Sequence, residues 1–244
     1  MNTYGLIGYA LGHAFPQSFF TQKVEEDQIE PQYLNFELED LTTIKEVLKD
    51  KTIKGLNVTI PYKKDIFAYL DEVSDEAKAI GAVNVIKLIR ENNQLKLVGY
   101  NSDIFGFKES IRPLLKPFHQ KALVLGTGGA SNAIKVGLSQ LGITTQSVSR
   151  TKQDDTITYN EVTKEVLTEY NIIVNCTPLG TYPNIEGAPD IPYQHLSTQH
   201  LLYDLVYNPA ETSFLRQGRV QGATTKNGLE MLYLQAIKAW EIWQ

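Results

Sequence analysis

A glycine-rich turn between an apolar strand pattern and a helical pattern constrains the fold of this chain more than any other feature. Apolar residues at 121–125 lead directly into Gly126-Thr127-Gly128-Gly129-Ala130-Ser131, and a helical pattern follows at 132–141. The next strand pattern, 144–149, ends about twenty residues after the glycines. This order of strand, turn, helix and strand is typical of a Rossmann-type dinucleotide-binding unit.

The residues of the turn suit a bound pyrophosphate. Gly126 permits a tight turn, and Gly128 lets the backbone approach the ligand closely. Gly129 and Ala130 begin the helix, whose N-terminal N–H groups stabilise negative charge. The third glycine of the usual motif is replaced by Ser131, so an ordinary glycine-rich turn between a strand and a helix remains the alternative.

The end of the second strand of this unit indicates which dinucleotide it binds. NAD sites usually carry an acidic residue there to hold the ribose hydroxyls. This chain has Ser149-Arg150-Thr151 instead. A guanidinium and two hydroxyls suit a 2′-phosphate, so we expect NADP rather than NAD. Asp154 and Asp155 lie too far along the chain for the ribose role unless a loop folds back.

Strand and helix patterns alternate along the rest of the chain, which indicates an α/β protein. Before the glycine turn, we expect strands at 4–7, 33–38, 56–60, 83–89 and 95–98, and helices from residue 16, at 41–48 and after Pro61. After it, strands are expected at 172–175 and 201–206. The joint between two domains is placed near 103–117, and an amphipathic helix at 227–243 is expected to fold back onto the first domain.

Composition narrows the functional classes. The chain has 244 residues, 42% hydrophobic and 21% charged, with a net charge of -5 and no long basic run, so nucleic-acid binding is not expected. A single cysteine, Cys176, favours a reducing cytoplasm. No stretch of 18 apolar residues occurs, and we expect neither a membrane span nor a targeting segment. The four histidines lack metal-ligand spacing, so no metal site is predicted.

A lysine follows one strand at an unusual place. In the run Gly55-Leu56-Asn57-Val58-Thr59-Ile60-Pro61-Tyr62-Lys63, alternation predicts a strand, and Pro61 predicts the first turn of a helix. Lys63 would then lie in that first turn, where the helix dipole disfavours a cation. Such an ammonium is a candidate for proton chemistry, and the alternative is an ordinary solvated lysine.

Four further polar positions lie at expected strand ends or on the last helix, where open α/β sheets bind ligands. Asn84 is either a ligand contact or a buried amide bonded to backbone. Asp103 precedes a helix and on local grounds is a capping or first-turn acid. Thr177, in the segment 175–180, lines the nicotinamide half of a cofactor or forms a plain turn. Gln235 reaches either a cleft or solvent.

Taken together, these segments resemble the shikimate dehydrogenase family in order and spacing over nearly the whole chain. The matching segments are 57–63, 81–84, 99–103, the glycine turn, 149–151, 175–180, 204–209 and 227–235. The resemblance implies an N-terminal α/β substrate domain, a doubly wound Rossmann-type NADP-binding domain, and a cleft between them. The implied bounds are 1–103 with 226–244 for the substrate domain and 104–225 for the NADP domain.

The resemblance also implies the activity and the site. The family reduces 3-dehydroshikimate to shikimate reversibly with NADP, in the biosynthesis of chorismate and the aromatic amino acids. We therefore expect a cytoplasmic enzyme, monomeric or homodimeric, with a small-molecule substrate. The implied catalytic residues are Lys63 and Asp103, the substrate-binding residues Asn57, Thr59, Asn84, Tyr207 and Gln235, and the cofactor-binding residues Gly126, Gly128, Gly129, Ala130, Ser149, Arg150, Thr151, Thr177 and Gly228.

One segment departs from the family pattern. A Ser-x-Ser pair that binds the substrate carboxylate normally follows a histidine near the N-terminus, but here His13 is followed by Ala14-Phe15-Pro16. Three interpretations stay open: a shikimate dehydrogenase with a rebuilt carboxylate site, a quinate-type or other cyclic polyol dehydrogenase, and an NADP-binding sensor without catalysis. Methylene-tetrahydrofolate dehydrogenase is a weaker alternative, because Tyr62 and Lys63 are adjacent rather than a helical turn apart.

Overall fold

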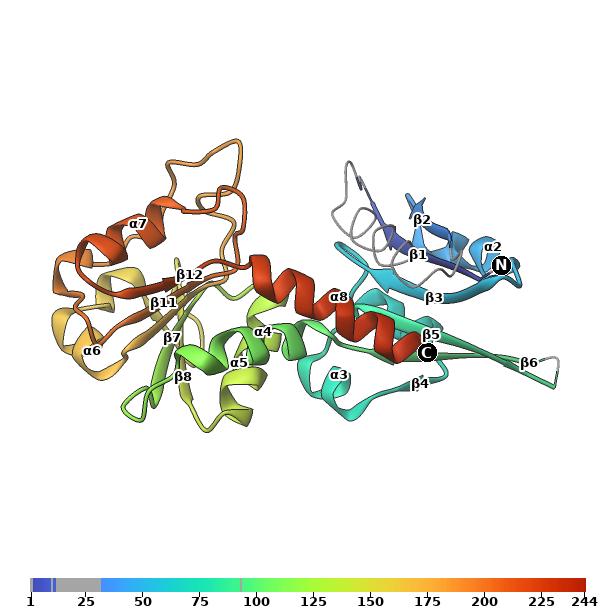
Figure 1. Cartoon of the computed structure of the whole chain (residues 1–244), viewed down its shortest axis with the longest axis horizontal. Helices are drawn as coiled ribbons and strands as arrows, with labels where there is room; N and C mark the ends of the chain where they lie inside the picture. Colours follow the sequence, from blue (N-terminus) through green and yellow to red (C-terminus); the bar gives the residue numbers. More distant parts are fainter. Residues whose placement is uncertain (1, 10, 12–31, 93) are drawn as a thin grey trace. The chain divides into compact units, whose positions relative to one another are not determined.

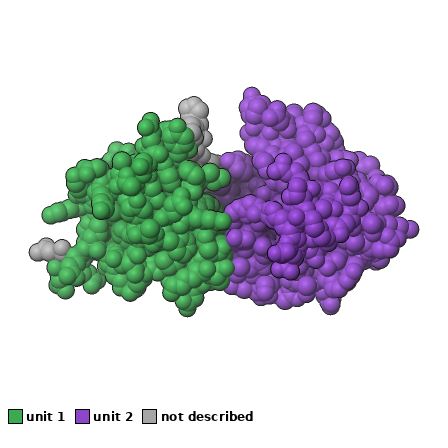
Figure 2. Space-filling view, turned by 180° about the vertical axis from the view of Figure 1, so that it is seen from behind, with its two compact units in different colours: residues 1–103, 235–244 green, residues 104–234 purple. Residues whose placement is uncertain are grey.

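The chain forms two compact α/β units. The computed structural model describes residues 2–9, 11, 32–92 and 94–244. One unit comprises Met1–Asp103 with Gln235–Gln244, and the other comprises Ile104–Leu234 (Figure 2). Each unit is built on a six-stranded sheet (Figure 1), so the predicted α/β class is confirmed.

The first unit has a mixed sheet with strand order β2-β1-β3-β5-β6-β4. The strands β1 and β2, β1 and β3, and β4 and β6 pair in parallel, whereas β5 is antiparallel to β3 and to β6. Its strands are β1 (Thr3–Gly8), β2 (Gln32–Glu37), β3 (Ile53–Val58), β4 (Glu72–Val73), β5 (Val85–Glu91) and β6 (Gln94–Tyr100). The helices among its described residues are α2 (Ile44–Val47), α3 (Asp75–Ile80) and the 3-10 helices η1 (Leu41–Thr43) and η2 (Asp65–Tyr69).

Both faces of this first sheet bury apolar side chains. One face packs on Ile44 of α2, Ile66 of η2 and Ala77 of α3. The other packs on Ala236, Ala239 and Trp243 of the last helix, α8 (Leu229–Trp243). The indole of Trp243 donates a hydrogen bond to the Ile86 carbonyl. Its ring occupies the space where a Cβ at position 55 would be, so glycine is required there for this close packing.

The second unit has an all-parallel sheet with strand order β12-β11-β10-β7-β8-β9. Numbered within the unit, this is the 3-2-1-4-5-6 order of the Rossmann fold. Its strands are β7 (Lys121–Leu125), β8 (Thr144–Ser149), β9 (Thr156–Thr158), β10 (Ile172–Asn175), β11 (Leu201–Asp204) and β12 (Thr224–Lys226). Its helices are α4 (Asp103–Ile111), α5 (Gly129–Gln140), α6 (Lys164–Glu169), α7 (Ser213–Val220), the start of α8, and the 3-10 helices η3 (Arg112–Leu114), η4 (Tyr159–Glu161) and η5 (Tyr193–His195).

The central strands of the second sheet are apolar at successive positions because both faces are covered by helices. Leu123 and Leu202 face a core that includes Leu167 of α6 and Phe214 of α7. Their neighbours in sequence face the opposite core, which includes residues of α4 and α5. Helices on both faces make this unit doubly wound, as the resemblance to the family implied.

The division between the units falls inside α8, between Leu234 and Gln235. The expected domain bounds placed residues 226–234 with the first unit. In the structure, β12 ends at Lys226 and pairs with β11, and Met231 packs against the core formed by α4 and α5. Residues 226–234 are therefore grouped with the second unit, and residues 235–244 with the first.

The expectation that Lys63 lies in the first turn of a helix is wrong. Residues 61–64 form turns, and η2 begins only at Asp65. The Lys63 carbonyl accepts a hydrogen bond from the Val83 N–H at 2.8 Å, whereas the Phe67 N–H donates to Lys64. An α-helix would need a bond from the Phe67 N–H to the Lys63 carbonyl, whereas the bond to Lys64 is of the 3-10 type, and Lys63 therefore precedes a 3-10 helix.

Candidate functional site

Three segments that are distant in sequence meet at one edge of the first sheet. Asn57 on β3 is opposite Val85 on β5, and Val85 is opposite Tyr100 on β6. Because β5 runs antiparallel to both neighbours, the segment after β3, the segment before β5 and the segment after β6 lie together. These segments carry Lys63, Asn84 and Asp103.

Lys63 and Asp103 form an ion pair. The Lys63 Nζ lies 2.6 Å from the Asp103 Oδ2, and both side chains are partly exposed, at 30% and 19%. The other carboxylate oxygen, Oδ1, accepts a hydrogen bond from Asn84 Nδ2 at 2.9 Å. Asp103 is thus bonded by a cation on one oxygen and an amide on the other. An ammonium has three donor hydrogens, so the ion pair leaves donor capacity for a ligand.

A buried serine orients the Asn84 amide. The Ser102 N–H donates to Asn84 Oδ1 at 2.7 Å, and the Ser102 hydroxyl accepts from Asn84 Nδ2 at 3.1 Å. The same hydroxyl donates to Gln235 Oε1 at 3.3 Å. Both Nδ2 hydrogens of Asn84 therefore have partners, Ser102 and Asp103. Of the two interpretations left open for Asn84, the geometry favours a buried amide, although its partners include side chains and not only backbone.

Asn57 is also held by internal hydrogen bonds. Its Oδ1 accepts from the Tyr33 hydroxyl at 2.9 Å, and its Nδ2 donates to the Asn84 carbonyl at 3.3 Å. Burial raises the pKa of Tyr33 well above its usual value, so the hydroxyl keeps its proton and donates. Thr59 is half-buried just beyond β3, with its N–H bonded to the Ile7 carbonyl.

Sequence reasoning missed Ser102 and Tyr33 as parts of this network. Ser102 adjoins Asp103 in the polar segment after β6, and that proximity was the available signal. Tyr33 carried none, because only the pairing of β1 with β2 and β3 places its hydroxyl near Asn57. The side-chain bonds described above link seven residues of the first unit through Asn84 and Ser102.

The glycine turn of the second unit fits a bound pyrophosphate. Gly126 has φ +99°, and a Cβ there would lie 3.0 Å from the Thr177 methyl group, so only glycine suits the position. Gly128 is the N-cap of α5, with no side-chain cap on the helix. Gly128, Gly129 and Ala130 are exposed. An uncapped, accessible N-terminus on a 12-residue helix offers N–H donors to an anion.

The segment after β8 presents a guanidinium to solvent. The Ser149 hydroxyl donates to the Thr151 carbonyl at 2.7 Å and accepts from the Thr151 N–H at 3.3 Å, which closes a tight turn around Arg150. Arg150 is exposed, and no side chain in the described part of the chain forms a hydrogen bond or salt bridge with it. The buried Ser149 therefore shapes the turn, and Arg150 is the accessible cation at this strand end.

Another network lies at the ends of β10 and β11. Asn175 Oδ1 accepts from the N–H of Thr177 at 3.0 Å and from its hydroxyl at 2.7 Å, which fixes the turn next to Gly126. Asn175 Nδ2 donates to the buried Asp204 at 3.0 Å, and the Thr212 hydroxyl donates to the other Asp204 oxygen at 2.6 Å. Burial raises the pKa of Asp204 to about 6, against the opposing effect of these donors.

The two remaining predicted site residues also lie in the second unit. Tyr207 follows β11 and is 41% exposed. Gly228 is buried, and a Cβ there would lie 2.2 Å from the Leu205 carbonyl oxygen, so any larger residue would displace the backbone. The second unit thus holds all nine predicted cofactor-binding residues and Tyr207. The first unit holds the other predicted site residues.

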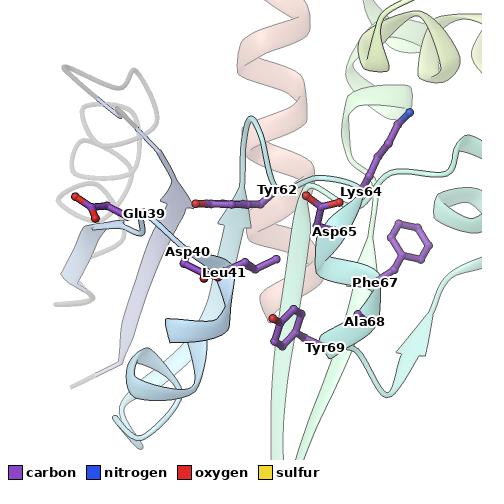
Figure 3. A pocket seen from close by; sticks show the side chains of 9 residues that line it. All are labelled: Glu39, Asp40, Leu41, Tyr62, Lys64, Asp65, Phe67, Ala68 and Tyr69. Carbon is purple, nitrogen blue, oxygen red and sulfur yellow. The ribbon is translucent and has the colours of Figure 1, made fainter.

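An open hollow of about 680 Å³ lies in the first unit beside the turn that carries Lys63 (Figure 3). Tyr62 and Lys64 line it, together with Glu39, Asp40 and Asp65, but Lys63 does not. The Tyr62 hydroxyl donates to the Leu38 carbonyl. The hollow is therefore separate from the Lys63–Asp103 pair.

The described residues include no cluster of three histidine, cysteine or acidic side chains able to hold a metal ion. None of their helices is both long and apolar enough to cross a membrane. The helix expected from residue 16, and the segment Ala14-Phe15-Pro16 that replaces the family's two serines, lie outside them.

A Rossmann-type unit joined to a second α/β unit that carries a lysine–aspartate pair defines the class as a two-unit, dinucleotide-dependent oxidoreductase. The family described as the shikimate dehydrogenase substrate binding domain matches residues 6–86. The shikimate dehydrogenase (NADP(+)) of Clostridium beijerinckii is 39% identical, with 100% of this chain and 92% of that protein covered. The chain belongs to the shikimate dehydrogenase family, as its sequence motifs predicted.

Solved structures agree with this assignment. Shikimate dehydrogenase from Aquifex aeolicus is 33% identical, has a TM-score of 0.87, and covers 100% of this chain and 92% of its own. Shikimate 5-dehydrogenase from Thermus thermophilus, in complex with NADP(H) and shikimate, is 29% identical with a TM-score of 0.86. It covers 100% of this chain and 94% of its own.

Proposed function

We propose that this protein catalyses the reversible, NADP(H)-dependent reduction of 3-dehydroshikimate to shikimate. The observation that carries the proposal is the ion pair between Lys63 and Asp103, which lie forty residues apart and are held at 2.6 Å beside Asn84. The relatives named shikimate dehydrogenase (NADP(+)) support the substrate and the cofactor.

Lys63 and Asp103 have distinct roles in this proposal. When bound, the reduced nicotinamide supplies a hydride to the ketone carbon. The Lys63 ammonium donates a hydrogen bond to the ketone oxygen and stabilises the negative charge that develops there. It then supplies the proton that completes the hydroxyl group. Asp103 keeps the ammonium in place and accepts a hydrogen bond from a neighbouring substrate hydroxyl.

The other first-unit residues bind and position the substrate. Thr59 and Gln235 offer polar groups to the ring hydroxyls, and Asn57 and Asn84 hold the shape of the site through their internal bonds. Tyr207 is proposed to contact the substrate carboxylate. Asn57 and Asn84 retain acceptor capacity on their amide oxygens, because each such oxygen has two lone pairs.

The cofactor residues of the second unit divide by the part of NADP they bind. The turn Gly126 to Ala130 receives the pyrophosphate, and Arg150 with Thr151 binds the 2′-phosphate. Thr177 and Gly228 border the nicotinamide half. The glycine positions support this division because two of them exclude a side chain.

An absorbance assay of NADP+ reduction tests the proposal, with shikimate, quinate and no acid as the three conditions. We expect turnover with shikimate, and we expect Asp103→Asn to reduce kcat without changing the affinity for NADP+. Turnover with quinate alone would replace the proposed substrate by a quinate-type acid. Cofactor binding without turnover on either acid would make the protein an NADP-binding sensor.

A further inference from the structure

A second cation in the cofactor-binding unit is neutralised by an acid from the neighbouring strand. The parallel register of β8 and β9 places Ser149 opposite Thr158, so the segments that follow both strands share one edge of the sheet. Lys152 comes three residues after Ser149, and Glu161 comes three residues after Thr158. Lys152 Nζ contacts both Glu161 oxygens, at 2.8 and 3.1 Å.

Glu161 is held where it is by more than the lysine. Its Oε2 accepts from the N–H of Thr158 at 2.7 Å and from the Thr158 hydroxyl at 2.9 Å. The bond from the Thr158 N–H belongs to the capping box of η4, in which the Thr158 side chain accepts from the Glu161 N–H. Together these donors, with Lys152 first, lower the pKa of Glu161 to about 2, so it is ionised at neutral pH. The acid is thus a permanent, anchored negative charge at this edge.

The remaining charges of this edge leave one cation uncommitted. Asp154 and Asp155 add two exposed carboxylates to the loop after β8. Arg150 is exposed and has no hydrogen-bond or salt-bridge partner in the described part of the chain. A 2′-phosphate arriving here would therefore meet the Arg150 guanidinium, while the ammonium of Lys152 is already paired.

We propose that Glu161 limits the preference of this protein for NADP over NAD by pairing with Lys152 and so withholding the second cation from the 2′-phosphate. This inference rests on the proposed cofactor site, and it adds a specificity-determining residue to that site. Among the described residues at this edge, Arg150 is then the cation left to bind the 2′-phosphate. Removal of the Glu161 charge frees Lys152, which then strengthens the binding of NADP but not of NAD, because only NADP carries the additional phosphate.

Calorimetric titration of the purified protein with NADP+ and with NAD+ tests the role of Glu161. The titrations are done at low ionic strength, where exposed ion pairs are screened least. We expect Glu161→Gln to raise the ratio of the NAD+ Kd to the NADP+ Kd by about threefold to tenfold, through tighter NADP+ binding. Lys152→Met leaves the Glu161 carboxylate without its cation, so it should weaken the binding of NADP+ and leave that of NAD+ unchanged. The double variant should return to the wild-type ratio.

The matched control is Glu169→Gln, because Lys121 and Glu169 form another exposed ion pair in the same unit, with Lys121 at the start of β7. It changes the net charge equally but lies away from the strand ends that bind the cofactor. Gln at position 161 preserves a capping box, so folding is retained, and thermal unfolding checks this.

The outcomes separate this inference from the proposed function. An unchanged ratio in Glu161→Gln, an equal rise in Glu169→Gln, or a ratio in the double variant well below that of the wild type would each overturn the role of Glu161. Those results leave the activity with shikimate intact. Loss of the proposed function would instead appear as absent turnover in the wild-type protein. Failure of the wild type to bind either dinucleotide would overturn both.

Discussion

Asn84 Nδ2 donates to Asp103 Oδ1 at 2.9 Å, and this bond leaves the opposite oxygen of the same carboxylate to Lys63. The amide itself is fixed by the Ser102 N–H on its oxygen. The position of the Lys63 ammonium thus depends on a chain of bonds that begins in the backbone of the segment after β6. Because each bond involves a buried or half-buried group, the chain is sensitive to the loss of any member.

Lys63→Ala should lower kcat by about 10²-fold or more, the contribution expected of a general acid. The matched control is Lys64→Ala, since Lys64 is an exposed neighbour that belongs to the lining of the separate hollow. Steady-state rates with shikimate and NADP+ compare the two variants. Equal rates for Lys63→Ala and the wild type would remove Lys63 from the mechanism.

Asn84→Ala should reduce both stability and turnover. The substitution leaves the Ser102 N–H without its acceptor in a fully buried position, which costs about 1 to 3 kcal/mol. It also removes the donor to Asp103, so the ion pair with Lys63 loses its fixed geometry. Urea unfolding measures the first effect and kcat the second. Wild-type kcat in a folded Asn84→Ala variant would show that Asp103 holds its position without the amide.

Gly126→Ala should destabilise the second unit by about 1 to 3 kcal/mol and abolish tight NADP+ binding. The reason is the left-handed φ of +99° and the contact of the new Cβ with Thr177. Gly129→Ala is the control, because its Cβ would meet nothing and its backbone is helical. In thermal unfolding without cofactor, the Tm of Gly129→Ala should equal or exceed that of the wild type. A Gly126→Ala protein as stable as Gly129→Ala would contradict the strain argument.

Asp204→Asn should change how stability depends on pH. The pKa of Asp204 in the folded protein, about 6, lies above its usual value of 3.8, so this carboxyl costs stability as pH rises from about 4 to 6. The variant lacks that cost, so its free energy of unfolding relative to that of the wild type should rise by about 1 to 3 kcal/mol across this interval. Urea unfolding at several pH values between about 4.5 and 7 measures the difference in the free energy of unfolding. This range begins just above the usual pKa of 3.8 and ends just above the raised pKa of about 6.

The control for Asp204→Asn is Asp190→Asn, which alters an exposed aspartate of the same unit. Its stability should run parallel to that of the wild type over the whole interval. If Asp204→Asn also runs parallel to the wild type, the buried carboxyl has an ordinary pKa. The three donors to Asp204 would then outweigh its burial.

Much of the second unit was predictable because its signals are local. The apolar strands, the glycine turn and the exposed Arg150 all follow from residues within a few positions of one another. The short elements β9, α6 and α7 were missed. Helices α6 and α7 begin after the N-cap residues Thr163 and Thr212. Threonine is common both at N-caps and in turns, so in the sequence it does not distinguish a helix start from a turn.

The prediction of a helix at Lys63 was wrong because the contacts that decide its structure are distant in sequence. Pro61 and the apolar residues after it do fit a helix, but the Lys63 carbonyl binds the Val83 N–H of the segment before β5, and the Phe67 N–H bonds to Lys64 as in a 3-10 helix. Asp103 lies in the first turn of α4, as local reasoning allowed, but its side chain also binds Lys63 and Asn84. Neither partner is near in sequence, so no local pattern reports it.

Local chemistry therefore accounts for the fold class, the dinucleotide-binding layout and the choice of residue types at the strand ends, because backbone conformation and helix capping depend on near neighbours. The convergence of Lys63, Asn84 and Asp103 required the antiparallel pairing of β5 with β3 and β6. The pairing of Lys152 with Glu161 required the parallel register of β8 and β9. Strand register is set by how whole apolar faces pack, and only the folded chain decides it.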